Sequence, residues 1–375
     1  MTTDEMAQAV FARDEVAKYL GGSHGVRGDE ARAKVEGYLD ELRTTQRYEL
    51  YRALEYPLYP ILRKLERIDE HLEHPRAAAA AGCRIVYASN HRSHMDYLLE
   101  LLALDDAGMK PPIIAAGINL FGGPLGLIHR HVTGALPIRR NTKDPAYHIT
   151  LKAYVAELLK AQDFFFYPEG GRSYSGELKS AKTGLLTACL QSGQPNLVIV
   201  PVSMAYDLVL EDHVLARQKV KGRQRAFSRE VAEMVRYAVG YRSRAFVTFG
   251  APIPVEDFAG DSRRSLLDLG HLVMARVGAQ VKVLPTALMA AAMGPSIPGA
   301  ELAGRIDAML ARLIASGANL DVRTSAAVIA AAAGPLEGRG IIAREDGLFR
   351  VRERGLLRYY ARTIEHLLPA PTPRD

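Results

Sequence analysis

The chain has 375 residues, which is enough for two domains or for one large domain with extensions. It carries 48 Lys and Arg against 42 Asp and Glu, a net charge of +6, and 48% of its residues are hydrophobic. This globular composition excludes collagen-like, disordered and low-complexity classes. Two cysteines, Cys83 and Cys189, are too few for a disulfide scaffold or a cysteine-based zinc site, and they favour a reducing compartment.

The N-terminal sequence mixes acidic residues into every turn, so we expect no signal peptide. The longest uncharged run, residues 111–128, is rich in Pro and Gly and is therefore poorly suited to a membrane-spanning helix. We expect this run to be buried or to touch a membrane shallowly. The basic excess suits an anionic lipid surface or an acidic partner. No nucleic-acid partner is expected, because zinc-finger and RNP motifs are absent.

Residues 1–75 are expected to form an N-terminal helical region, because apolar residues such as Val35, Leu39 and Leu42 recur at helical spacing among charges. From residue 76 to 258, short apolar runs alternate with helical patterns. Strands are expected at 84–89, within 134–140, and at 164–167, 196–205 and 245–250, with helices at 95–104, 146–161 and 182–191. This alternation predicts an α/β domain in which helices pack on a sheet.

Residues 259–375 are expected to form an Ala-rich C-terminal helical region. Near its end, the sequence GRGIIAREDGLFRVRERG predicts a β-hairpin with Asp346 and Gly347 at its turn. The hairpin lies between two helical segments, which is a winged-helix-like arrangement. We interpret it as a packing element, because similarity at the level of fold does not by itself indicate function.

Residues 90–96, NHRSHMD, place a His and an Asp five positions apart. On a regular helix this spacing turns the side chains about 140° apart. They can meet only if His91 lies on a strand-to-helix loop and Asp96 on the first helical turn. Asp96 would then fix the tautomer of His91, whose other nitrogen could accept a proton from a hydroxyl.

Two alternatives exist for this segment. Ser93 could be the N-cap of a helix, with Asp96 completing a capping box. His91, His94 and Asp96 could instead bind a metal, but no companion ligand cluster occurs elsewhere in the sequence, so we expect no metal.

Two further segments carry residues suited to bind an anion, although they also fit a simple strand end and a tight turn, and a third segment has a proline within a strand. Residues 134–140, GALPIRR, end in two guanidinium groups that can bind phosphate oxygens. Residues 166–173, FYPEGGRS, follow an apolar strand with two glycines that let backbone amides approach a ligand. In residues 199–202, IVPV, Pro201 interrupts a strand, which predicts an edge strand, a bulge or a position facing a ligand.

In this order and spacing, the four segments resemble the motifs of the glycerolipid acyltransferase superfamily. HRSHMD matches its H-x4-D motif, and GALPIRR, YPEGGRS and IVPVSMAYD match its second, third and fourth motifs. The His-Arg-Ser start, Gly171, the following LKSAKTGLL and the C-terminal LLRYYARTIEHLL are similar to the glycerol-3-phosphate acyltransferases of the PlsB type and to dihydroxyacetone-phosphate acyltransferases. The resemblance extends from about residue 84 to the end, in a chain much shorter than PlsB proteins.

The resemblance implies that His91 and Asp96 form a catalytic dyad. It implies substrate-binding roles for Arg139, Arg140, Glu169, Gly170, Gly171, Arg172, Ser173, Lys182 and Pro201. The expected reaction moves a fatty acyl group from acyl-CoA or acyl-acyl carrier protein to the sn-1 hydroxyl of glycerol 3-phosphate, without a cofactor. Because the sequence has no G-x-S-x-G motif, the substrate hydroxyl would attack directly.

Two alternatives to this reaction remain at the level of sequence. The acceptor could be 1-acylglycerol 3-phosphate (lysophosphatidate) or dihydroxyacetone phosphate. A distant alternative is a non-enzymatic nucleic-acid-binding protein, suggested by the pI near 9.2 and the wing-like hairpin.

A basic stretch between residues 217 and 229 contains no acidic residue. In an arbitrary protein it would be a solvated loop. With lipid substrates, it predicts peripheral attachment to the anionic cytoplasmic face of the cell membrane. Its basic residues are Arg217, Lys219, Lys221, Arg223, Arg225 and Arg229.

Overall fold

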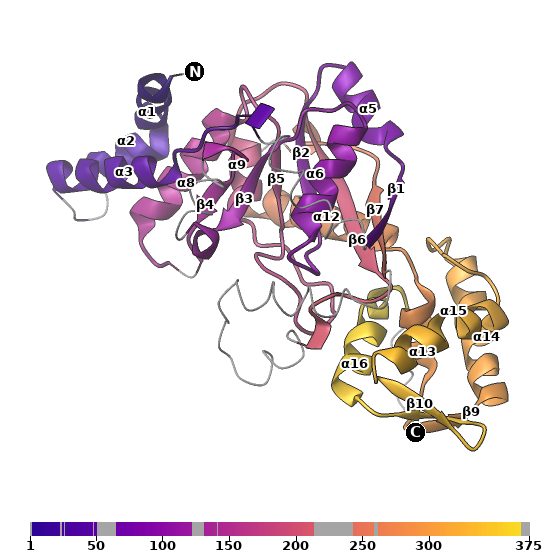
Figure 1. Ribbon diagram of the computed structural model, residues 1–375. Coiled ribbons are helices and arrows are strands. Elements are labelled where there is room, and N and C mark those ends of the chain that lie inside the picture. The colour runs from indigo at the N-terminus through magenta and orange to yellow at the C-terminus, as the bar shows by residue number, and fades with distance from the viewer. Residues whose placement is uncertain are drawn as a thin grey trace.

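The computed structural model describes residues 2–22, 25, 27–47, 49–50, 65–121, 131–140, 142–213, 243–258 and 262–368. Within these ranges the chain forms a mixed eight-stranded sheet with helices on both faces (Figure 1). The strand order is β1-β7-β6-β2-β5-β3-β4, and β8 also pairs with β6. The α/β fold class predicted from the sequence is therefore confirmed.

Five strands of the sheet are ones that the sequence predicts. These are β2 (Arg84–Ser89), β4 (Leu136–Ile138), β5 (Phe164–Phe166), β6 (Leu197–Tyr206) and β7 (Ser243–Phe249). Strands β2 to β6 run parallel to their neighbours, whereas β7 and β8 (Ile253–Pro254) run antiparallel to β6. Helices cover both faces, so the central strands are almost continuously apolar. Because β2 to β6 run parallel, their carboxyl ends lie at the same edge of the sheet.

Two strands were not expected from the sequence. β1 (Leu65–Glu70) lies in the stretch assigned to N-terminal helices, but it pairs in parallel with β7 at the edge of the sheet. Only its first residue is buried, so no alternating apolar pattern reveals it. β3 (Ile113–Gly117) lies in the uncharged run 111–128, which at this point is a strand of the core. Residues 122–130 of that run lie outside the described residues.

Helices form a layer on each face of the sheet. α5 (Glu73–Ala80) and α6 (Asp96–Asp106) cover one face, and α8 (Pro145–Leu158), α9 (Gly184–Gln191) and α12 (Arg263–Gln280) cover the other. The sequence assigned α12 to the C-terminal region. It packs on β6 and α9 instead, because its apolar stripe, which includes Leu269, Val273 and Val277, is buried against the sheet.

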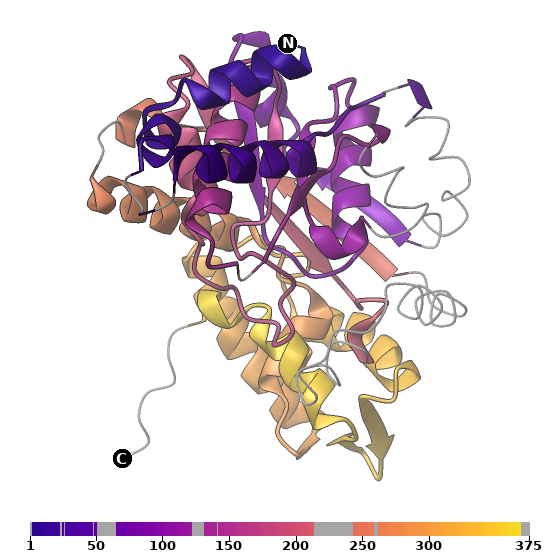
Figure 2. The same ribbon diagram turned by 90° about the vertical axis from the view of Figure 1, so that its left-hand side faces the viewer.

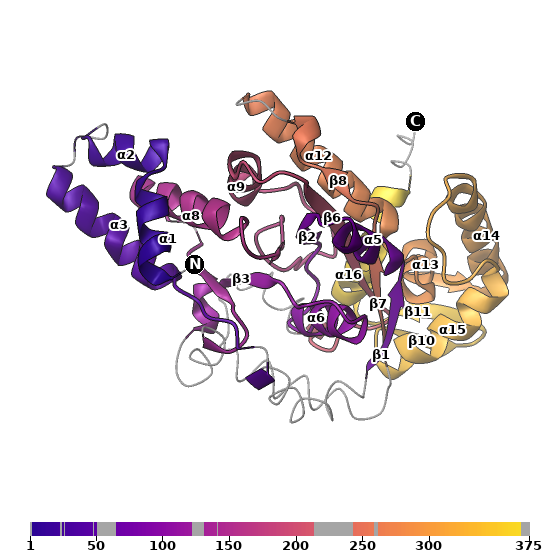
Figure 3. The same ribbon diagram turned by 90° about the horizontal axis from the view of Figure 1, so that it is seen from above.

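The predicted helical regions lie at opposite ends of the molecule (Figure 2). The N-terminal helices α1 (Thr3–Phe11), α2 (Asp14–Leu20) and α3 (Gly28–Leu42) pack against α8 (Figure 3). The C-terminal helices are α13 (Pro285–Ala292), α14 (Gly299–Ala315), α15 (Ser325–Gly338) and α16 (Arg354–Arg362). No helix of the described residues is both long and apolar enough to span a bilayer.

The predicted C-terminal hairpin is confirmed. β10 (Ile342–Glu345) and β11 (Leu348–Val351) are antiparallel, and β9 (Ser296–Pro298) adds a third strand beside β11. Asp346 and Gly347 have φ values of 52° and 75°, the left-handed conformation that tight two-residue hairpin turns require.

Buried polar contacts attach the C-terminal region to the segment that follows β6. The Tyr360 hydroxyl donates to Asp212 Oδ2 at 2.6 Å, and Arg339 Nη2 donates to Asp212 Oδ1 at 2.8 Å. Arg244 bridges Asp207 and Asp321 in the same area. These contacts position the residue adjacent to Asp212, Glu211, which reaches the loop after β2.

Candidate active site

The sheet topology brings three of the four sequence motifs to one edge. β2 leads into His91, β5 leads into Tyr167 and Glu169, and β4 leads into Arg140. The carboxyl ends of adjacent parallel strands are where α/β sheets bind ligands. A pocket at this edge, here called the His91 pocket, is lined by His91, Tyr167 and Arg140 together with residues of β3 and α6, including Ala115, Ala116, Gly117, Tyr97 and Leu101.

The geometry predicted for the His-Asp pair is confirmed. His91 lies on the loop after β2, and Asp96 is the first residue of α6. The His91 Nδ1 atom lies 2.8 Å from Asp96 Oδ2. An ionised carboxylate can only accept, so Nδ1 carries the proton and Nε2 is the nitrogen able to take one from a substrate.

Asp96 is fully buried and accepts three further hydrogen bonds. The amides of Arg92 and Ser93 donate to Oδ2 at 2.6 and 2.9 Å, and the Tyr206 hydroxyl donates to Oδ1 at 2.6 Å. The alternative in which Ser93 is the N-cap of α6 does not hold. Met95 occupies that position, and the Ser93 hydroxyl donates to Glu211.

Burial governs the protonation of His91. It lowers the pKa of the imidazole to about 4, and the hydrogen bond and charge of Asp96 oppose this shift only in part. The nearby positive charge of Arg172 and the neighbouring His94 lower the pKa further. His91 is therefore a neutral base near pH 7.

Of the two arginines at the end of GALPIRR, the structure places Arg140 in the His91 pocket. Its guanidinium group lies beside Gly117 and Gly171, and no carboxylate of the described residues pairs with it. Arg139 instead binds Glu41 of α3 through two nitrogens, and its guanidinium carbon lies 5.2 Å from the centre of the Tyr38 ring. The structure thus does not bring Arg139 to the pocket.

Glu169 and Ser173 hold the site loops together. Glu169 is buried and accepts the amide of His91 at 3.1 Å and the amide of Lys179 at 3.1 Å. Burial raises the pKa of its carboxyl group. The Ser173 amide donates to the His91 carbonyl at 2.8 Å, and its hydroxyl donates to the Glu177 carbonyl. In this geometry both residues support the backbone of the loop that carries His91.

The two glycines of the third motif allow cationic side chains to approach the loop closely. Gly170 has a φ of 74°, and a Cβ there would lie 2.6 Å from the Lys182 Cδ atom. Lys182 therefore crosses directly over this glycine. A Cβ on Gly171 would lie 3.5 Å from Arg140 Nη1. Glycine is therefore required at position 170 for two reasons: its φ is positive, and the Lys182 side chain occupies the space that a Cβ would fill.

Arg172 is buried behind the pocket, with its Nη1 atom 3.6 Å from a carboxylate oxygen of Glu211. Glu211 also accepts hydrogen bonds from the Ser93 hydroxyl and the His94 amide, at 2.9 and 2.7 Å. Sequence reasoning missed Glu211. The only local signal was an acidic pair, Glu211-Asp212, directly after an apolar run.

Pro201 is not among the residues that line the His91 pocket. β6 is an interior strand, so of the three alternatives given for Pro201 the edge strand is excluded. The Pro201 carbonyl accepts from the Gly250 amide, where β7 has ended, so the missing N–H of Pro201 falls where the β7–β6 ladder stops. By strand alternation Pro201 shares a face with Ser203, whose hydroxyl donates to the Gln280 carbonyl of α12.

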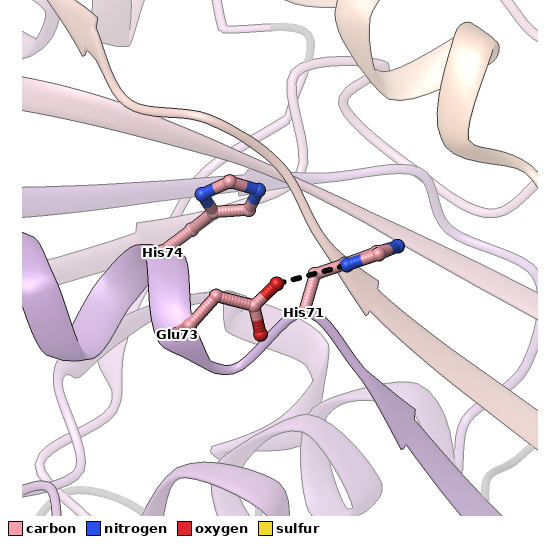
Figure 4. Close-up of side chains that lie close together, drawn as sticks. All are labelled: His71, Glu73 and His74. Atoms are coloured by element: carbon pink, nitrogen blue, oxygen red, sulfur yellow. Dashed lines mark hydrogen bonds and ion pairs between the residues drawn. The ribbon is translucent and has the colours of Figure 1, made fainter.

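A separate group of possible metal ligands lies at the start of α5. In the part of the chain that the structure describes, the ligand atoms that cluster within 4.8 Å belong to His71, Glu73 and His74 (Figure 4). His71 Nδ1 lies 3.0 Å from a Glu73 oxygen, and both side chains are exposed. None of the three lines the His91 pocket.

Comparison with known proteins supports the motif assignment. Residues 67–205 match the Acyltransferase family model. A glycerol-3-phosphate acyltransferase of Aeromonas hydrophila is 36% identical over 247 residues, which is 63% of this chain and 30% of that protein. The enzyme of the same name from Actinobacillus succinogenes is 37% identical over 241 residues, covering 61% of this chain and 29% of that protein.

Among solved structures, the 1-acyl-sn-glycerophosphate (LPA) acyltransferase PlsC from Thermotoga maritima matches over 73% of this chain and 93% of that chain. The sequence identity is 15% and the TM-score is 0.35, which is too low to support an assignment. The chain spans about 30% of the length of the curated relatives it matches. The resemblance predicted from the motifs is nevertheless confirmed: residues 67–205 match the Acyltransferase family model, and the chain is similar to glycerol-3-phosphate acyltransferases over about three fifths of its length.

Proposed function

We propose that the chain transfers a fatty acyl group from an acyl-CoA or acyl-acyl carrier protein thioester to the sn-1 hydroxyl of glycerol 3-phosphate. One observation carries this proposal. His91 is held by the buried carboxylate of Asp96, and its imidazole lines a pocket that also contains the guanidinium group of Arg140. A neutral base beside a cation suits an acceptor that carries both a hydroxyl and a phosphate. The names of the similar curated proteins support the same acceptor.

The proposed reaction needs no covalent enzyme intermediate. His91 Nε2 removes the proton of the acceptor hydroxyl as the oxygen attacks the thioester carbonyl carbon. The charge of Asp96 stabilises the imidazolium that forms. When the C–S bond breaks, His91 returns the proton to the departing thiolate. The products are lysophosphatidate and the free thiol of the carrier.

Arg140 is the proposed contact for the acceptor phosphate. Hydrogen bonds between a guanidinium group and a phosphate are charge-assisted and often bidentate, so one such group contributes both affinity and orientation. Burial is the main cause that lowers the pKa of Arg140 and of His91, and the charge of Arg172 lowers both further, so Arg172 adds to the positive potential of the site. Arg139 is not proposed to bind the phosphate, because its guanidinium group is bound to Glu41.

We also propose that the protein attaches peripherally to the cytoplasmic face of the cell membrane. Its lipid product and its basic stretch between residues 217 and 229 support this. That stretch lies outside the described residues. A basic segment near an anionic leaflet gains about 1 kcal/mol per Lys or Arg.

The acceptor is tested by incubating the full chain with palmitoyl-CoA and, separately, glycerol 3-phosphate, dihydroxyacetone phosphate and lysophosphatidate. Mass spectrometry identifies each product, and initial rates give kcat/KM for each acceptor. We expect the highest kcat/KM with glycerol 3-phosphate. A preference for either other acceptor would reassign the substrate, and a folded protein that acylates none of the three would overturn the proposal.

A further inference from the structure

The imidazole of His91 is covered on one face by an aromatic ring. The ring of Tyr167 stacks on it with the centroids 4.0 Å apart and an interplanar angle of 12°. Phe165, two residues earlier on the chain, contacts the Tyr167 ring edge-on at 5.4 Å. The hydrogen bond to Asp96 fixes one nitrogen of His91, but a single hydrogen bond leaves the imidazole able to swing about it. The Tyr167 ring opposes that movement.

Tyr167 is itself held from α6. Its hydroxyl lies 2.7 Å from Glu100 Oε2, and the other oxygen of Glu100 is hydrogen-bonded to the Ser89 hydroxyl. Glu100 is fully buried. It follows Asp96 by four residues, so both carboxyl groups project from the same face of α6. One face of α6 therefore contacts His91 in two ways. Asp96 binds the Nδ1 atom, and Glu100 holds the Tyr167 ring that covers one face of the imidazole.

We propose that Tyr167 is a positioning residue for His91, and that Glu100 and Ser89 hold it through a hydrogen-bonded network that carries no net charge. The role in catalysis rests on the proposed function. The contact with the imidazole does not depend on it.

Every proton in this network has an acceptor when Glu100 is a neutral acid. The Ser89 hydroxyl and Glu100 Oε1 are hydrogen-bonded to each other. With a proton on Oε1, Glu100 becomes the donor in this contact, and the Ser89 hydroxyl is then left to donate to the Asn90 carbonyl at 3.1 Å. The Tyr167 hydroxyl donates to Oε2. Burial raises the pKa of Glu100 well above its usual range, and the charge of Asp96 raises it further.

The neutrality of Glu100 has a consequence for His91. A second carboxylate close to Asp96 would stabilise the imidazolium, and would therefore favour a protonated His91 that cannot act as a base. With Glu100 uncharged, the tyrosine ring excludes water from the imidazole without adding charge. This agrees with burial being the largest influence on the pKa of His91.

The first test replaces the ring. We expect Tyr167→Leu to lower kcat about ten-fold, equivalent to about 1.4 kcal/mol, with little change in the KM of either substrate. In NMR titrations of the His91 ring, we expect its pKa to rise from about 4 towards the ordinary value of 6.5, since water reaches the exposed face. Tyr87→Leu is the matched control. It removes a buried ring of the same core that stacks on Phe165 and does not touch His91.

The second test separates the ring from the charge. Tyr167→Phe keeps the stacked ring, so the His91 pKa should stay near 4. Glu100→Gln reproduces the neutral network, because its carbonyl can accept from Tyr167 and its amide can donate to Ser89. It should therefore retain kcat within about three-fold, a change of less than about 1 kcal/mol.

Two outcomes would overturn the proposal. Unchanged kcat and unchanged His91 pKa in a folded Tyr167→Leu variant would show that the ring does not position His91. A ten-fold loss of kcat in Glu100→Gln would show that Glu100 acts as a carboxylate. If the wild type acylates no acceptor but the His91 pKa still responds to Tyr167→Leu, the proposed function fails while the positioning contact stands.

Discussion

Replacing Asp96 with Asn separates two tasks of this carboxylate, orienting His91 and stabilising its charge. Oδ2 accepts from His91, Arg92 and Ser93, whereas within the described residues Oδ1 accepts from the Tyr206 hydroxyl alone. In Asp96→Asn the three N–H donors select the amide oxygen for the Oδ2 position. The amide nitrogen then faces Tyr206, whose hydroxyl can turn to accept. The tautomer and orientation of His91 should survive.

The magnitude of the loss follows from the missing charge. At an effective dielectric constant of about 20, unit charges about 4 Å apart attract by about 4 kcal/mol. The imidazolium is only partly formed in the transition state, so about half of this, about 2 kcal/mol, is lost, or about thirty-fold in kcat. A replacement that reverses the histidine tautomer, as in catalytic triads, costs about 10⁴-fold.

The assay compares kcat and KM of Asp96→Asn and Asp96→Ala with palmitoyl-CoA and glycerol 3-phosphate. Asp96→Ala leaves the amides of Arg92 and Ser93 without their acceptor, so it should lose both stability and orientation and reduce kcat far more than Asp96→Asn does. A folded Asp96→Asn variant as inactive as Asp96→Ala would refute the reasoning that the backbone amides preserve the orientation of His91.

Three further outcomes are expected. Arg140→Ala should raise the acceptor KM about ten-fold or more, since a charge-assisted contact contributes about 1.5–3 kcal/mol. Arg139→Ala, the matched control, should leave the acceptor KM nearly unchanged. A larger increase in Arg139→Ala than in Arg140→Ala would place the phosphate on Arg139. Burial lowers the pKa of His91 to about 4, so kcat/KM should stay constant as the pH falls to about 5 and decrease only near pH 4. A decrease in kcat/KM with an inflection near pH 6.5 would contradict the burial of His91. The protein should pellet with anionic liposomes at low salt and be released as the salt concentration rises. Pelleting should weaken when Gln replaces Arg217, Lys219, Lys221 and Arg223. Pelleting that does not depend on the salt concentration would contradict electrostatic attachment.

The parts of the fold and site that could be predicted are those encoded over short stretches of sequence. β5 is a continuous apolar run and β2 contains one, and the His91–Asp96 contact spans one loop and one helical turn. The hairpin turn at Asp346 and Gly347 is encoded by two residues that tolerate positive φ.

The parts that could not be predicted depend on tertiary contacts. Nothing in the local sequence distinguishes Arg139 from Arg140. The structure separates their roles because Glu41 of α3, nearly a hundred residues away in the chain, binds Arg139. Tyr206 and Glu211 reach the catalytic loop from more than a hundred residues downstream. β1 fully buries only its first residue, so its pairing with β7 leaves little trace in its own sequence.

The central claim is that His91 is the base for acyl transfer to glycerol 3-phosphate. The most direct measurement incubates wild type and His91→Ala with palmitoyl-CoA and glycerol 3-phosphate, and quantifies lysophosphatidate and free CoA by mass spectrometry, with circular dichroism to verify that both proteins are folded. We expect the wild type to form the two products in equal amounts and His91→Ala to form neither above the uncatalysed rate. Near wild-type formation of lysophosphatidate by a folded His91→Ala variant would contradict the account.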